Sequence, residues 1–301
     1  SLGFTGGDLF INGQYAYVTY NAGILPGYKV NVYDISNPTS ISLVSSRAVA
    51  AGTNGTTNSI LQTRGSLMYL LTSYSDSCVL NTVDISDPRS MRSIDTYTVS
   101  ASYACRDMAI RDKYLYALTT ATIHKIDITI PRSTFEAGNA GTVSVDQLYS
   151  LDIKGNYLYV WKANSNTGYL STYYINDTEL EWFHTATVTG AGNGELRVAG
   201  DYAYVVNKTT TDGVSMLHIF EITGSSVAAV PILSKNLSSM GEDAYRFDIS
   251  GNSLYLASEA RSRVYALDLG GINSHAASIG SLEAYRANVK GDANIDRELH
   301  V

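Results

Sequence analysis

Acidic and arginine side chains recur at alternate positions of short apolar runs along this chain of 301 residues. The residues that share this pattern are Asp107, Asp152, Glu195, Arg197, Arg246, Asp248 and Arg286. Carboxylates and guanidinium groups gathered around one opening can bind a sugar, an ion or a peptide through charge-assisted hydrogen bonds. The same groups can instead pair with each other and join neighbouring structural units. The sequence leaves both interpretations open.

The last residues of the chain offer a second set of oxygen ligands. Asp292, Asn294, Asp296 and Glu298 are spaced like the first ligands of a calcium-binding loop. Such a loop needs a glycine at its sixth position for a sharp turn, where this chain has Arg297. We therefore favour an ordinary solvated strand end, with calcium as a weak alternative, and expect no other cofactor.

Recognised catalytic patterns do not occur in the sequence. The five histidines lack the paired spacing of a metal site. There is no Gly-x-Ser-x-Gly nucleophile turn and no phosphate-binding loop. We assign no catalytic residue and favour a non-enzymatic role, with an enzyme that has a dispersed site as the alternative.

One short sequence motif, which we call the repeat phrase, occurs six times. Its copies define the strands that must position these side chains. In each copy a turn residue, usually glycine, is followed by a strand that ends in tyrosine. The final tyrosines are Tyr17, Tyr69, Tyr116, Tyr159, Tyr204 and Tyr255. Their spacing of 43 to 52 residues in a β-rich chain is typical of a β-propeller.

Each repeat contains four short runs with period-two alternation, which predicts four antiparallel strands and thus one propeller blade. The first strand of each blade lies nearest the axis, so its polar positions are expected to face the axis or its mouth. An acidic residue closes the third strand of most repeats, at Asp34, Asp84, Asp127, Glu221 and Asp268. We interpret these acids as turn builders that accept backbone amides rather than as a catalytic or metal site.

The repeats predict one all-β domain over residues 1–301. Blades start near residues 8, 60, 107, 150, 195, 246 and 286. The seventh start is followed by residues for only two strands, so we expect a composite last blade that also uses Ser1 to Thr5; six blades are the alternative. We expect the chain to be a mature form or a piece of a larger protein.

The repeat phrases resemble the LVIVD-repeat family of β-propellers. The resemblance is carried by Ile11-Asn-Gly-Gln-Tyr-Ala-Tyr-Val18 with Val30-Asn-Val-Tyr-Asp-Ile-Ser-Asn-Pro38, and by Asp84-Ile-Ser-Asp-Pro88 in the second repeat. The later repeats depart from the Asp-Ile-Ser-Asp-Pro turn. The resemblance implies a propeller fold and an exported surface protein.

Composition and net charge limit the classes of partner that this protein is expected to bind. A net charge of −7 argues against nucleic acid as a partner, and no apolar run is long enough to span a membrane. Cys78 and Cys105 fall on adjacent blades at the same predicted face. We favour a disulfide between them, with two free thiols as the alternative, and an extracellular or cell-surface location.

Loops of variable length on that face are the predicted binding elements, because loops carry function on a rigid scaffold. We expect a non-catalytic module for binding, adhesion, or surface or fibre assembly, with a protein, a glycan or copies of itself as partner. The alternative is a hydrolase or lyase acting on polysaccharide at the channel mouth. Aromatic candidates in the loops are Tyr20, Tyr28, Tyr74 and Tyr103, and glycosylation sequons begin at Asn54, Asn176, Asn207 and Asn236.

Overall fold

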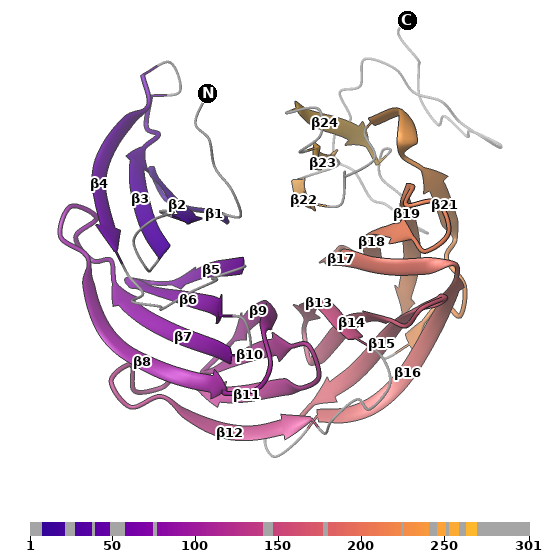
Figure 1. Cartoon of the computed structure of the whole chain (residues 1–301), viewed down its shortest axis with the longest axis horizontal. Helices are drawn as coiled ribbons and strands as arrows, with labels where there is room; N and C mark the ends of the chain where they lie inside the picture. Colours follow the sequence, from indigo (N-terminus) through magenta and orange to yellow (C-terminus); the bar gives the residue numbers. More distant parts are fainter. Residues whose placement is uncertain are drawn as a thin grey trace, which may run out of the picture.

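The computed structural model of the chain describes residues 8–21, 28–37, 40–48, 58–74, 77–140, 147–176, 180–223, 226–240, 246–250, 253–258 and 263–269. These residues form six small antiparallel sheets placed one after another around a common axis (Figure 1). The chain is therefore an all-β propeller.

The first three blades each have four strands in sequential order. Blade one contains β1 (Leu9–Asn12), β2 (Tyr15–Asn21), β3 (Tyr28–Asp34) and β4 (Ser42–Ala48). Blade two contains β5 (Asn58–Arg64), β6 (Leu67–Tyr74), β7 (Ser77–Asp84) and β8 (Arg92–Ser100). Blade three contains β9 (Cys105–Arg111), β10 (Tyr114–Thr119), β11 (Ile123–Asp127) and β12 (Phe135–Ala140).

The last three described blades vary more. Blade four contains β13 (Gln147–Lys154), β14 (Tyr157–Ala163), β15 (Thr167–Ile175) and β16 (Leu180–Thr189). Blade five contains β17 (Ala191–Ala199), β18 (Tyr202–Thr209), β19 (Ser215–Thr223) and two short pieces that both pair with β19, β20 (Ser226–Val227) and β21 (Leu233–Asn236). A 3₁₀ turn, η1 (Ser238–Met240), precedes blade six, which contains β22 (Arg246–Ser250), β23 (Ser253–Ser258) and β24 (Arg263–Asp268).

The hydrophobic core lies between successive blades. Tyr69 of blade two, for example, is buried in the same cluster as Met108 and Leu115 of blade three. The final tyrosine of the phrase is buried in each of the first five blades. Each blade thus buries one apolar face against its neighbour, which explains why the phrase recurs at the spacing of a blade.

The turn residue of the phrase is a glycine because the backbone there is left-handed. Gly155 has a φ of +57°, and the equivalent glycines in the other described turns are similar. Blade three has Asp112 at this place, with a φ of 50°. Aspartate tolerates this region better than most residues but still less well than glycine.

Three of the five acidic turns behave as the sequence predicts. The Oδ1 atoms of Asp34 and Asp84 each accept the backbone N–H two residues later, at 2.9 Å, and Asp127 accepts that of Thr129 at 2.8 Å. Hydrogen bonds from the side chain and backbone of Ser36 lower the pKa of Asp34, and those from the backbone and side chain of Ser86 lower the pKa of Asp84, so both carboxylates are held in the charged form. Their role is to build the turn between strands three and four.

The described residues account for six blades, the number given as the alternative. The expected seventh blade falls on residues 284–301 and Ser1 to Thr5, which lie outside the described residues, so seven blades are not confirmed. Blades one and six face each other across the open part of the ring in Figure 1.

Candidate functional site

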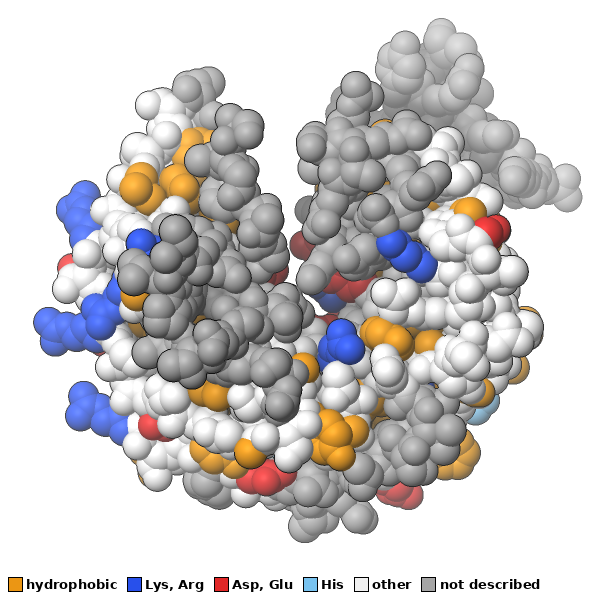
Figure 2. Space-filling model, viewed as in Figure 1, with side chains coloured by type: hydrophobic (Ala, Val, Ile, Leu, Met, Phe, Trp, Pro, Cys, Tyr) orange, Lys and Arg blue, Asp and Glu red, His pale blue; other side chains and the backbone are white. Residues whose placement is uncertain are grey.

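The first strands of the blades line the centre of the ring (Figure 1), and acidic and basic side chains gather inside this central hollow (Figure 2). Most of the predicted candidate residues lie on these strands, namely Asp107 on β9, Asp152 on β13, Glu195 and Arg197 on β17, and Asp248 on β22. Strand pairing with period two directs them away from the apolar face of each strand.

Asp107 shows what these acids do in the fold. Its Oδ2 atom accepts the hydroxyl of Ser150 at 2.6 Å and the backbone N–H of Leu151 at 3.0 Å, both from blade four. Its Oδ1 atom accepts the N–H of Met108, the next residue, at 2.8 Å. Both carboxylate oxygens therefore accept hydrogen bonds from the protein itself, and one of them joins two blades.

Equivalent interblade hydrogen bonds occur in blades one, four and five, where the accepting side chain also lies five residues before the turn residue; blade two has the apolar Ile60 at this position. The bonds run from Leu61 N to Asp8 Oδ2 at 2.8 Å, from Leu196 N to Ser150 Oγ at 3.1 Å, and from Phe247 N to Glu195 Oε2 at 3.0 Å. A polar side chain of one blade thus satisfies a backbone amide of the next. Because buried amides must find an acceptor, these bonds hold the inner edge of the ring together.

Two positions later, Asp152 repeats the arrangement in blade four. It accepts the N–H of Ile153 at 2.7 Å and that of Val198 from blade five, also at 2.7 Å. Burial raises the pKa of Asp152 to about 6, although these hydrogen bonds and the nearby Arg197 act in the opposite direction. The raised pKa reflects a carboxylate that is held away from water.

Arg197 occupies the middle of the acidic group. Its guanidinium lies 2.5 Å from Glu195 Oε1 and 3.9 Å from Asp248 Oδ1. Burial alone lowers the pKa of Arg197, but the surrounding carboxylates, led by Glu195, raise it above its usual value. The described centre is therefore a single guanidinium among several acids, held by interactions within the protein.

The structure does not describe the side chains of the remaining predicted site residues, although Arg246 begins β22. The side chain of Arg246 is not described, and Arg286 and the weak calcium candidates Asp292, Asn294 and Asp296 lie beyond residue 269. Within the described ranges, no group of three or more acidic, histidine or cysteine residues could hold a metal ion. No helix in those ranges is long and apolar enough to cross a membrane.

A second candidate surface lies on the face where strand two meets strand three and where one blade leads to the next. Its loops are linked by backbone hydrogen bonds. Thr120 N donates to Ala104 O at 3.1 Å, and Leu148 N donates to Thr120 O at 3.3 Å. We call this surface the loop face, meaning residues 101–104, 120–122, 164–166, 190 and 210–214.

Polar side chains also hold the loops of this face internally. Thr119 Oγ1 accepts the N–H of Thr122 at 3.0 Å, and Asn164 Oδ1 accepts that of Thr167 at 2.9 Å. Thr209 Oγ1 likewise accepts the N–H of Val214 at 2.9 Å. Sequence reasoning missed this organisation, although a Thr or Asn at the start of each loop is a recognisable signal for such turns.

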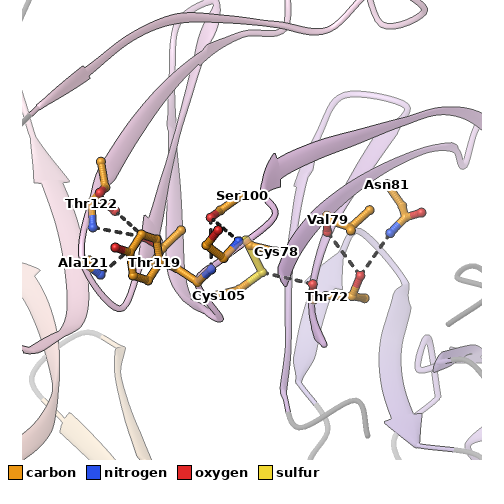
Figure 3. The surroundings of a disulfide bond; sticks show 11 residues. Thr72, Cys78, Val79, Asn81, Ser100, Cys105, Thr119, Ala121 and Thr122 are labelled. Carbon is orange, nitrogen blue, oxygen red and sulfur yellow. Dashed lines mark hydrogen bonds between the residues drawn. A yellow bond between two sulfur atoms is a disulfide. The ribbon is translucent and has the colours of Figure 1, made fainter. Parts of the chain in front are cut away.

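The predicted disulfide between Cys78 and Cys105 is present at the edge of the loop face (Figure 3). The two Cα atoms are 4.9 Å apart, and both residues are buried. Cys78 is the second residue of β7, the third strand of blade two, and Cys105 is the first residue of β9, the first strand of blade three. The bond therefore fixes two blades to each other close to the loop of Thr119 to Thr122, as Figure 3 shows.

The two tryptophans and the candidate loop tyrosines differ in their surroundings. Trp161 is fully buried and donates its indole N–H to Gly192 O, so it belongs to the core, whereas Trp182 on the outer strand β16 is exposed. Tyr103 on the loop face is 41% exposed. The side chains of the other three loop tyrosines are not described. Asn207 is fully buried, so the folded protein has no room for a glycan at that sequon.

Comparison with known proteins agrees with the fold. Residues 6–48 match the LVIVD repeat. Blade one is an LVIVD repeat. This match, on a chain that folds as a propeller, confirms the resemblance inferred from the repeat phrases. Among curated proteins, no sequence matches the chain.

Several solved structures share the propeller. A provisionally assigned 6-phosphogluconolactonase of Bacteroides fragilis is 15% identical with a TM-score of 0.69, and the match covers 86% of this chain and 79% of that protein. The periplasmic gluconolactonase PpgL of Pseudomonas aeruginosa is 14% identical with a TM-score of 0.68, covering 87% and 81%. Hydrazine synthase of Kuenenia stuttgartiensis is 18% identical with a TM-score of 0.64, covering 89% and 77%. At these identities the likeness shows the fold alone.

Proposed function

We propose that this LVIVD-repeat propeller is a non-catalytic recognition module that works outside the cytosol and binds its partner through the loop face. The observation that carries the proposal is the hydrogen-bonded organisation of that face. Its loops are fixed within themselves, to each other and, at one edge, by a disulfide. A surface fixed before binding loses little conformational entropy when a partner docks, which favours recognition.

The acidic residues on the first strands face the axis of the ring, and we call them the axial acids. Their hydrogen bonds favour a structural rather than a catalytic role for these residues. Both carboxylate oxygens of Asp107, Asp152 and Glu195 accept hydrogen bonds from the protein. A general base or a nucleophile needs an oxygen that can reach the substrate. Contact of these side chains with a ligand stays a prediction.

The chemistry of the loop face fits a glycan best among the expected partners. The described loops present hydroxyl and amide groups, with Tyr103 as an exposed aromatic ring and Asp212 as an exposed carboxylate. Sugars are bound by hydrogen bonds to their hydroxyls and by stacking on aromatic rings. The disulfide is consistent with an oxidising compartment such as the periplasm or the cell surface.

A binding screen tests the proposal. The isolated, oxidised protein is applied to an array of neutral and acidic oligosaccharides and to a peptide array, and its self-association is measured by sedimentation velocity. We expect saturable binding to at least one class of probe, or assembly of the protein. A monomeric protein that binds none of the probes would contradict the proposed function.

A hydrolase or lyase acting on polysaccharide at the channel mouth is the second candidate. The observation in its favour is Asp152, whose pKa of about 6 lies in a range suited to proton transfer. The gluconolactonase structures share the fold but do not extend their activity to this chain. Release of reducing sugar from polysaccharides, lost when Asp107, Glu195 and Arg246 are replaced together, would favour this candidate over the first.

A further inference from the structure

The first strands of blades three and four, which contact each other at the centre of the ring (Figure 1), bulge at the same place. The pairing of β9 with β10 passes from Asp107 to Cys105 and leaves out Arg106. The pairing of β13 with β14 passes from Ser150 to Leu148 and leaves out Tyr149. Arg106 and Tyr149 are equivalent, since each lies six residues before the turn residue of its blade. Bulges redirect side chains out of the regular alternation of a strand and are frequent beside functional sites.

The two bulged side chains meet across the interface between the blades. The guanidinium carbon of Arg106 lies 5.6 Å from the centroid of the Tyr149 ring, which is within the range of a cation–π contact. The hydroxyl of Tyr149 donates a hydrogen bond to Gln147 Oε1 at 2.9 Å. Both Arg106 and Tyr149 are partly exposed, so a ligand at the loop-face end of these strands can reach them.

The backbone around this pair is fixed by neighbouring contacts. Thr120 N donates to Ala104 O at 3.1 Å, and Thr120 O accepts the N–H of Leu148 at 3.3 Å. Cys105, the residue before Arg106, is held by the disulfide. The pair is therefore positioned before any ligand binds, which lowers the entropic cost of binding.

The positive charge of Arg106 has no acidic partner within the described ranges. Its guanidinium makes no hydrogen bond or ion pair there, and its Nε is buried without an acceptor. Asp107, the next residue, uses both carboxylate oxygens in hydrogen bonds to Met108 and to blade four. Arg197, by contrast, lies 2.5 Å from Glu195. Because a partly desolvated cation without an acceptor is costly, this arrangement favours an anionic ligand.

A second cation and a second aromatic ring lie at the same end of these blades. Lys162 is the strand partner of Leu148, and its Nζ is 5.4 Å from the centroid of the Tyr169 ring. Tyr103, which is 41% exposed, precedes Arg106 by three residues, so their Cα atoms are at most about 11 Å apart. A short oligosaccharide can span that distance.

We propose that Arg106 and Tyr149 form the acid-binding subsite of the loop face and that its ligand is an oligosaccharide carrying uronate carboxylates. The inference rests on the proposed function of that face and names the class of ligand. A planar carboxylate accepts two parallel hydrogen bonds from a guanidinium, which a single neutral hydroxyl does not. Tyr103 supplies the ring on which a sugar stacks. An acidic peptide supplies the carboxylate but not the sugar face for that ring.

Titration calorimetry with charged and esterified sugars tests the subsite. The probes are oligomers of galacturonate, glucuronate and mannuronate, their methyl esters, which keep the sugar but lose the charge, and an oligoglutamate of equal length. The oxidised natural protein is compared with Arg106→Gln and Arg111→Gln. Both arginines belong to β9, but Arg111 lies at the opposite end of the strand, where it bonds Asn156, and so provides the matched control.

The proposal predicts that at least one uronate oligomer binds about tenfold or more tightly than its methyl ester. Arg106→Gln should abolish this preference for the acid, and Arg111→Gln should retain it. Equal binding of acid and ester, or equal losses in the two variants, would overturn the proposal. So would an oligoglutamate that binds as tightly as the best uronate, since the ligand would then be an acidic peptide.

Failure of this inference differs from failure of the proposed function. Binding only to neutral sugars or to uncharged peptides, or self-assembly alone, would overturn the acidic subsite and leave recognition through the loop face in place. A monomeric protein that binds no probe contradicts both.

A measurement on the natural protein covers the case in which Arg106→Gln fails to fold. Raising the salt concentration from about 0.05 M to about 0.5 M should weaken binding of the uronate oligomer several-fold and leave that of its methyl ester unchanged, because salt screens the charge pair. Uronate binding that does not depend on salt would contradict the subsite. Arg106→Lys, which keeps the charge but not the planar fork, should recover part of the preference for the acid.

Discussion

The carboxylate of Asp107 accepts the backbone N–H of Leu151 across the interface between blades three and four, with 3.0 Å between Oδ2 and N. This contact, repeated around the inner edge of the ring, turns a polar residue of one blade into the acceptor for a buried amide of the next. The axial acids are therefore part of how the blades are joined.

Replacement of Asp107 by alanine should destabilise the protein by about 2 kcal/mol, because two backbone amides and a hydroxyl lose their acceptor. Asp107→Asn keeps one oxygen acceptor, so its free energy of unfolding should fall by less than that of Asp107→Ala. Glu181→Ala, an exposed acid on β16, serves as the control and should change the free energy of unfolding by less than about 0.5 kcal/mol. Urea unfolding measures all three, and equal stability of Asp107→Ala and Glu181→Ala would contradict the structural role.

Removal of the disulfide should lower stability without changing the fold. The bond joins residues 27 apart in the sequence, and loops of this length contribute about 2–4 kcal/mol. The variant with both Cys78→Ser and Cys105→Ser should unfold at a correspondingly lower urea concentration. A reducing agent should destabilise the natural protein but leave this double variant unchanged. If the reductant affected both proteins equally, the effect would not come from this bond.

The turn at Asp112 offers a stabilising substitution. Asp112→Gly removes the backbone strain of a non-glycine residue in the left-handed region. It should raise the free energy of unfolding by roughly 0.5 kcal/mol, despite the loss of the exposed ion pair with Arg111. Gly155→Ala at the equivalent turn of blade four is the matched opposite change and should cost about 1 kcal/mol. Thermal unfolding of both variants checks the pair, and a destabilised Asp112→Gly would contradict the argument.

The stability of the protein should depend on the protonation of Asp152. Because burial raises its pKa from 3.8 to about 6 in the folded protein, the folded state binds a proton that the unfolded state has released between these values. The contribution of this group to stability is fully present below pH 4 and is lost as the pH rises through 6. Relative to Asp152→Asn, the natural protein should lose up to about 3 kcal/mol between pH 4 and 7. A difference between the two proteins that is flat with pH would contradict this.

His218 should have the opposite dependence. Burial lowers its pKa from 6.5 to about 4, and its Nδ1 lies 2.8 Å from Ser234 Oγ on β21. Its contribution to stability is present above pH 6.5 and is lost as the pH falls through 4. The natural protein should therefore lose up to about 3 kcal/mol relative to His218→Gln over this range. Urea titrations at several pH values separate this effect from that of Asp152, because the two have opposite signs.

The sequence predicted those features that repeat. The repeated tyrosine phrase indicated the propeller and the acidic turns of the kind seen at Asp34. Aligning the repeats also placed Cys78 and Cys105 on one face. It could not indicate that Asp107 reaches Leu151, because alternation gives the face of a strand but not the distance to the next blade. Nor could it show that Thr119 and Thr120 form hydrogen bonds that hold the loops of this face, since those bonds depend on how neighbouring loops are placed in space.

The most direct test of the proposed function compares the two ends of blade three. Tyr103 lies exposed on the loop face, and Ile130 lies exposed in the turn between β11 and β12 on the opposite face. The dissociation constant of the best oligosaccharide or peptide probe is measured for the natural protein, Tyr103→Ala and Ile130→Ala. Recognition through the loop face predicts at least tenfold weaker binding for Tyr103→Ala and no change for Ile130→Ala. Unchanged binding by Tyr103→Ala, or equal losses in both variants, would contradict it.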